Sequence, residues 1–261
     1  MRRLPGLVLA LVLCAPPLAA QLHVQASPPG RINVTWTEPA DQGQAERLQE
    51  MAARLKPTSD QLEPLDLIEI QVVHTQRELD QRLGPGREGS LSGSSYVHGI
   101  LFLSPPAWQR QPTTEALELE LREAMVSYTV TRLAAGNRVP DWLAEGLVAY
   151  LTRRPVAPAT AEIVVAHGPL LLTAAAADDF TPGYWAVRYL VEERGGIPPL
   201  RQLLRVTAQR PDTFVENLQL IYGVTAGELE RAWRGWLEKI LAEDKRKREG
   251  GVRVGPLPPS R

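Results

Sequence analysis

RVPDWLAEGLVAYL, at residues 138–151, is the most informative stretch of the chain. Pro140 stands where the first turn of a helix favours a proline, because the missing N–H group would have no partner there. Leu143, Leu147 and Tyr150 then follow at helical spacing. The sequence therefore predicts a helix that begins at Pro140 and ends just after this stretch.

Helical spacing also continues on both sides. Before the stretch, Thr113 or Thr114 can cap a helix that ends at Gly136 and Asn137. After it, four more helices are expected, at Tyr184–Arg194, Pro199–Ala208, Phe214–Tyr222 and Ala226–Leu241. The tryptophans of these helices have spacings typical of core packing: Trp142, Trp185, Trp233 and Trp236. This half of the chain is thus predicted to be mostly helical.

The first half of the chain has strand patterns instead. Ile32–Trp36 alternates apolar and polar residues, and Ile68–Val73 and Val97–Leu103 have the same character. Helical segments are expected near residues 44–55 and 77–83. Strands followed by helices are typical of an α+β protein. We expect an α+β fold with a small N-terminal mixed sheet and its helices, followed by a mostly helical half.

Residues 1–20 have the three-part layout of a secretory signal peptide. Arg2 and Arg3 precede an apolar run, and small residues lead to an expected cleavage site after Ala20. The apolar run is too short to span a bilayer stably. We expect a periplasmic, cell-envelope or secreted protein of a bacterium. Membrane contact is expected only through an uncleaved signal or through lipidation of Cys14.

Composition sets the remaining boundaries. The predicted domain occupies residues 31–242, between a linker at 21–30 and a disordered basic tail at 243–261 that has almost no apolar residues to bury. The 29 Lys and Arg residues are balanced by 30 Asp and Glu residues, so no nucleic-acid partner is expected. A single cysteine excludes an internal disulfide.

The predicted helix at residues 138–151 closely resembles the Pro-x-Trp-Leu-x-Glu-Gly-Leu-Ala helix of the peptidase-MA-like family, relatives of the gluzincin metallopeptidases. The later segments YWAVRYLVEERGG, LRQLLR and IYGVTAGELERAWRGWL are similar to the C-terminal helices of that family. In the order of its elements, the resemblance extends from about Arg31 to Leu241. It implies that the helical half is zincin-like.

In the metal enzymes to which the resemblance points, the preceding helix carries His-Glu-x-x-His. The two histidines bind zinc, and the glutamate activates the zinc-bound water. The third ligand is a glutamate of the next helix, a position that Glu145 matches. The family's usual spacing places Glu123 at the general-base position, but Arg122 and Val126 stand where the two histidines should be. Neither side chain can bind zinc.

These substitutions predict a pseudo-metallopeptidase that has no cofactor and no catalytic activity. In the metal enzymes the cation neutralises the inward-facing carboxylate on the second helix. Here Arg122 would supply that charge to Glu145 through a two-pronged hydrogen bond. Glu123 and Glu145 would then have structural roles.

Two other interpretations stay open. An active zinc metallopeptidase with an unorthodox ligand set, hydrolysing peptide bonds, would need His98, His167 and Glu145 to meet in space. An unrelated exported helical protein, similar to the family only at the WLAEG segment, would lack the strand layer before residue 104.

A peptide-binding surface can outlast the loss of zinc. In metallopeptidases of this type, the edge strand beside the cleft holds an extended peptide by adding it to the sheet. The candidate cleft residues are Val97, His98, Gly99, Ile100, Tyr150 and Tyr184. The expected partner is an extended peptide or an envelope protein, and the expected role is peptide binding or structural support in the cell envelope.

Overall fold

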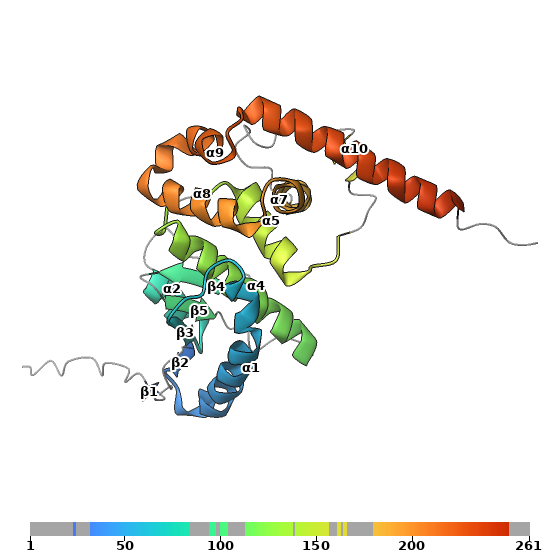
Figure 1. The fold of residues 1–261 in the computed structure, drawn as a ribbon. Helices are drawn as coiled ribbons and strands as arrows, with labels where there is room; N and C mark the ends of the chain where they lie inside the picture. Colours follow the sequence, from blue (N-terminus) through green and yellow to red (C-terminus); the bar gives the residue numbers. More distant parts are fainter. Residues whose placement is uncertain are drawn as a thin grey trace, which may run out of the picture.

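The fold begins with one sheet and continues as a layered group of helices (Figure 1). The computed structural model describes residues 23–24, 32–83, 94–97, 100–103, 113–137, 139–156, 161–162, 164–165 and 180–250. The predicted signal peptide, most of the predicted linker, His98, Gly99 and His167 lie outside these residues. The predicted α+β order, with strands first and helices afterwards, is confirmed.

The sheet has five strands in the order β1-β2-β3-β5-β4. Their bounds are His23–Val24 for β1, Ile32–Trp36 for β2, Ile68–Val72 for β3, Ser94–Val97 for β4 and Ile100–Leu103 for β5. The three inner strands are parallel, and each edge strand is antiparallel to its neighbour. The sheet is therefore mixed, as predicted.

One predicted strand is wrong. The run from Val97 to Leu103 is two strands, because β4 and β5 pair antiparallel with Val97 opposite Ile100. Only two residues, His98 and Gly99, separate the strands in the sequence, and a glycine in a two-residue connection is typical of a hairpin. As a result β5 lies inside the sheet, between β3 and β4, and β4 is the edge strand.

Helices α1 (Gln42–Asp60) and α4 (Thr114–Leu133) cover one face of the sheet. Alternate residues of the strands point to this face and are buried there with the apolar residues of the two helices. We call this cluster the sheet core: Ile32, Val34, Trp36, Ala45, Leu48, Met51, Ala52, Leu55, Ile68, Ile70, Val72, Leu103, Leu117, Leu121, Ala124, Met125 and Tyr128. Short segments complete this unit: a 3-10 turn at Pro39–Asp41 and α2 at Gln76–Leu83.

Thr113 caps α4, as predicted, because its side-chain oxygen accepts a hydrogen bond of 3.1 Å from the Ala116 N–H. The other helices follow α4. They are α5 (Asp141–Thr152), α7 (Phe180–Glu193), α8 (Ile197–Gln209), α9 (Phe214–Tyr222) and α10 (Ala226–Gly250), with a 3-10 turn at Pro211–Thr213 before α9. Each predicted helix of this half is present. In the part of the chain that the structure describes, no helix is both long and apolar enough to cross a bilayer.

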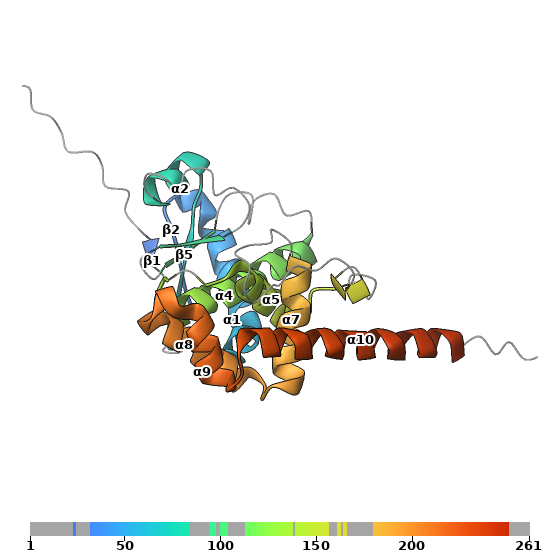
Figure 2. The same cartoon turned by 90° about the horizontal axis from the view of Figure 1, so that it is seen from above.

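Helix α10 projects beyond the body of the molecule (Figure 2). It continues to Gly250, so the start of the tail that was predicted to be disordered from residue 243 is helical. Composition placed the boundary too early, because a segment without apolar residues can still have good helix formers. Lys, Arg and Glu dominate EDKRKRE, and these residues favour a helix even when they bury nothing.

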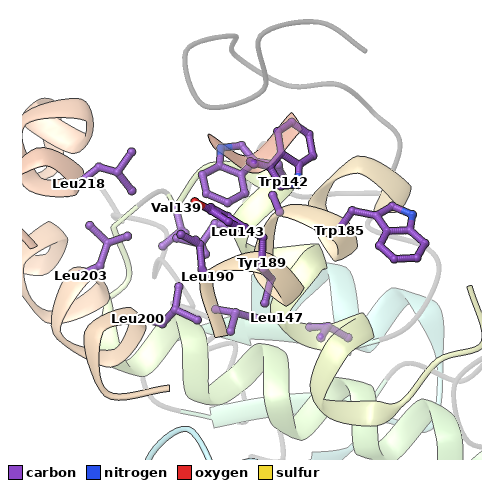
Figure 3. Packing of buried hydrophobic residues seen from close by; sticks show 14 of the residues in the cluster. Val139, Trp142, Leu143, Leu147, Trp185, Tyr189, Leu190, Leu200, Leu203 and Leu218 are labelled. Carbon is purple, nitrogen blue, oxygen red and sulfur yellow. The ribbon is translucent and has the colours of Figure 1, made fainter. Parts of the chain in front are cut away.

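The helices after α4 bury a second cluster, the helical core, which includes the four tryptophans predicted to pack there: Trp142, Trp185, Trp233 and Trp236. Figure 3 shows Trp142 and Trp185 among its residues. Helices α5 and α7 cross very closely at Gly146 and Gly183. A Cβ atom on Gly146 would lie 2.3 Å from the Gly183 carbonyl oxygen, and one on Gly183 would lie 2.2 Å from the Trp142 oxygen. Only glycine permits this approach of the two backbones.

Candidate functional site between helices α4 and α5

Helix α4 belongs to both cores and positions the candidate site between them. Leu121 and Met125 point into the sheet core, whereas Val126 and Val130 point into the helical core. Glu120 and Glu123 are one turn apart, so they share a third face of the helix. This face is half-buried.

The C-terminal end of α5 returns the chain toward this face of α4. Arg153 adopts a left-handed conformation with φ 57° and ψ 37°, and the Arg154 N–H donates a 3.0 Å hydrogen bond back to the Ala149 carbonyl. This is a common way to end a helix, although glycine usually occupies the left-handed position. The turn directs the Arg154 side chain to Glu123.

Arg154 and Glu123 form a two-pronged ion pair. The Arg154 Nε donates to Glu123 Oε1 at 2.8 Å, and a terminal guanidinium nitrogen donates to Oε2 at 2.5 Å. The side chains are 27% and 17% exposed, respectively. A bidentate pair of this kind, partly shielded from water and joining two helices, is the geometry in which an arginine–carboxylate interaction is strongest. The general-base position is thus occupied by a paired carboxylate.

Two more carboxylates are close enough to respond to this pair. Partial burial raises the pKa of Glu120, the negative charge of Glu123 raises it further, and Arg154 opposes both effects. Glu145 is exposed, but the protein around its carboxyl group still screens it in part from water and raises its pKa. The charge of Arg154 opposes this rise, and the charges of Glu123 and Asp141 add to it. The hydrogen bonds to Glu123 raise the pKa of Arg154 in turn, and the charges of Glu145 and Glu120 act in the same direction.

The predicted pairing of Arg122 with Glu145 is wrong. Glu145 is exposed on α5, and within the described residues the structure records no ion pair for Arg122. The cation beside Glu145 is Arg154. The prediction failed because it sought the counter-ion inside the segment that replaces His-Glu-x-x-His. Arg154 is 31 positions away from Glu123 in the sequence, and only the turn at Arg153 brings it back.

Val126 stands at the position of the second missing histidine and is fully buried in the helical core. Its side chain packs among apolar neighbours of α4 and α5. Arg122, at the position of the first missing histidine, is half-buried. Of the two positions that would hold zinc-binding histidines, one is thus an apolar core residue, Val126, and the other is a cation, Arg122.

Two of the predicted cleft residues are brought together by α5 and α7. Tyr150 and Tyr184 are neighbours, with ring centroids 6.4 Å apart. Burial raises the pKa of Tyr150, and the groups that modify the shift are Glu192, Tyr184 and Arg188, none of which affects Glu145. The tyrosines therefore belong to the α5–α7 side of the molecule.

Two residues of the strand part of the predicted cleft are also neighbours. Val97 ends the edge strand β4 and lies directly opposite Ile100, which starts the inner strand β5. His98 and Gly99 lie outside the described residues. Both strands lie against α4, the helix that carries Glu123. The edge of the sheet and the ion pair are therefore linked through α4.

Sequence reasoning did not identify Glu120 or Arg154 as members of the site. The i, i+3 spacing of Glu120 and Glu123 is visible in the sequence and could have suggested a shared face.

Another polar pair lies at the carboxyl ends of β2 and β3, where His74 Nδ1 is 2.8 Å from the buried Asp41 carboxylate.

Among the residues that the structure describes, no group of three or more His, Cys, Asp or Glu side chains is arranged to hold a metal ion. The alternative ligands His98 and His167 are not among these residues. A scan against protein-family models finds no match for this chain, and a search of curated proteins finds none either.

Proposed function

We propose that this chain is an exported, non-catalytic relative of the peptidase-MA-like metallopeptidases that binds an extended peptide or an envelope protein. The observation that carries the proposal is the bidentate ion pair between Glu123 and Arg154. A general base must be free to accept a proton from a zinc-bound water. A carboxylate with both oxygens engaged by a guanidinium is poorly suited to that role.

The substitutions at the two histidine positions support the same conclusion. Val126 offers no lone pair and is packed in an apolar core, and Arg122 is cationic. A catalytic zinc needs three protein ligands, and Glu145 alone cannot replace them. Glu123 then has a structural role, because its pair with Arg154 joins α4 to the end of α5.

The arrangement of the sheet supports peptide binding. The edge strand β4 is antiparallel to β5, and among the described strands β5 is its one neighbour. Such a strand has unpaired backbone N–H and C=O groups that an added peptide strand can bind. The strand β4 also lies beside α4, the helix that carries Glu123.

Binding of a random library of extended peptides to the purified chain, with sequencing of the retained peptides, tests the proposal. Ser95→Pro and Tyr96→Pro provide matched variants, because the N–H groups of adjacent strand residues point to opposite sides. Proline at the outward-facing position should abolish binding and leave the fold intact. Hydrolysis of the peptides in the presence of zinc would contradict the non-catalytic part of the proposal.

A further inference from the structure

The site between α4 and α5 holds more negative than positive charge. Glu120 and Glu123 come from α4, Glu145 from α5, and within the described part of the chain Arg154 is the cation that acts on all three. Carboxylates that share a site repel one another, and a nearby cation offsets part of that cost. In a metal enzyme this cation is the metal ion.

The position of Arg154 is fixed from two directions. Its backbone N–H is bonded to the end of α5 at Ala149, and its guanidinium is bonded to both oxygens of Glu123 on α4. The left-handed turn at Arg153 is unusual for a residue with a Cβ atom. This left-handed turn immediately precedes Arg154 and turns its guanidinium toward Glu123.

We propose that Arg154 is the built-in counter-ion of this site, and that its guanidinium holds α4 and α5 together as a bound cation would. The inference rests on the proposed function and deepens it, because it says how a site without metal ligands keeps its glutamates compensated. Arg154 is a positioning residue in this account. It acts on Glu120, Glu123 and Glu145 and contacts no substrate.

In the natural chain these carboxylates are not arranged to hold a metal ion. Removal of the guanidinium should leave them uncompensated and free to turn toward a divalent cation, and carboxylate oxygens are the preferred ligands of Ca²⁺. The experiment measures the thermal midpoint of the full chain with and without millimolar Ca²⁺, for the natural protein and for Arg154→Met. We expect Arg154→Met to melt about 3–6 °C lower than the natural protein. Ca²⁺ should restore part of this loss, and it should not shift the natural protein.

Arg82→Met is the matched control. Arg82 also pairs with a carboxylate, Glu78, and the side-chain exposures of 28% and 20% are close to those of Arg154 and Glu123. That pair lies within α2, and Arg82 donates to the carboxylate of Glu78 alone. The Arg82→Met variant should melt at a lower temperature than the natural protein, and Ca²⁺ should not change its melting point. Glu123→Gln/Arg154→Met, which removes the central carboxylate as well, should also lose the Ca²⁺ response.

A Ca²⁺ response that is equal in all variants, or absent from Arg154→Met, overturns the proposal. If Arg154→Met does not fold but Glu123→Gln/Arg154→Met does, uncompensated charge is the cause and the proposal is supported. If neither folds, Arg154→Lys decides: a folded lysine variant supports the counter-ion role, and an unfolded one overturns it. None of these results depends on peptide binding, so a failure here is distinct from a failure of the proposed function.

Discussion

The sheet core and the helical core differ in how they bury apolar surface. The sheet core is mainly aliphatic. Every second residue of its strands points toward the apolar faces of α1 and α4. The helical core is rich in large aromatic residues, including four tryptophans, and it depends on the close crossing of α5 and α7. The sheet core can therefore adjust by small side-chain shifts, whereas the helical core is limited by contact between backbones.

The two units are joined by one short segment as well as by α4. Leu62 follows α1, yet it is fully buried in the helical core. Next to it, Glu63 accepts hydrogen bonds of 2.9 and 2.8 Å from Arg205 and lies 3.2 Å from Arg201, both on α8. Arg201 also donates to the Leu62 carbonyl at 2.5 Å. The candidate site lies on the same boundary, so the contacts between the units fix its geometry.

The largest effect is expected at the α5–α7 crossing. Gly146→Ala or Gly183→Ala should lower the free energy of unfolding by about 4 kcal/mol, because the new methyl group meets a backbone carbonyl that cannot move aside. Urea denaturation measures the change. Gly235→Ala on α10 is the control: its Cβ has open space, and the helix should gain about 0.5–1 kcal/mol. If both alanine variants were as stable as the natural protein, contact between the two helix backbones would not be what limits this core.

Leu62→Ala tests whether the two units unfold together. A cavity in the helical core should cost about 3 kcal/mol, although the residue belongs to the chain segment between α1 and β3. Denaturation followed by both tryptophan fluorescence and circular dichroism should give one shared transition at a lower midpoint. Two separate transitions would mean that Leu62 is the main link between otherwise independent units.

Glu63→Gln probes the polar part of the same link. Arg205 is 55% exposed, so water screens its pair with Glu63, and the expected loss is about 0.5–1 kcal/mol. The loss should shrink in 1 M salt, because salt screens exposed charges. Thermal melting in low and high salt measures both values. Equal losses in the two conditions would point to packing of the Glu63 side chain and not to its charge.

Glu145→Gln should have the smallest effect and the opposite sign. The pKa of Glu145 is raised above its ordinary value of 4.5 in the folded chain, so its ionisation costs stability as the pH rises from 4.5 through the folded value. Neutral glutamine removes this cost, and the variant should be more stable at pH 7 by less than about 0.5 kcal/mol, since the residue is exposed. Stability curves between pH 4 and pH 8 show the difference. A loss of several kcal/mol would instead support a buried ion pair between Arg122 and Glu145.

The sequence predicts much of the fold, because apolar spacing is a local property. The helices of the second half and the strands β2 and β3 are where their patterns place them. The hairpin β4–β5 was missed because one apolar run covers both strands. The length of α10 was missed because helix propensity without burial leaves no apolar pattern.

The candidate site was predictable only in part. The resemblance indicates Glu123 and Glu145, and both lie near the border of α4 and α5. Arg154 depends on a left-handed residue at Arg153, which is not a glycine and gives no sequence signal. A contact across 31 positions that requires one unusual turn is a tertiary property, and the same turn determines which arginine neutralises the glutamates.

The zinc content of the purified chain, after equilibration with zinc and removal of free ions by gel filtration, tests the central claim most directly. The account predicts far less than one zinc ion per chain, because Arg154 engages Glu123 and neither Arg122 nor Val126 offers a ligand. About one zinc ion per chain, retained through the column, would contradict it and would direct attention to His98 and His167 as ligands.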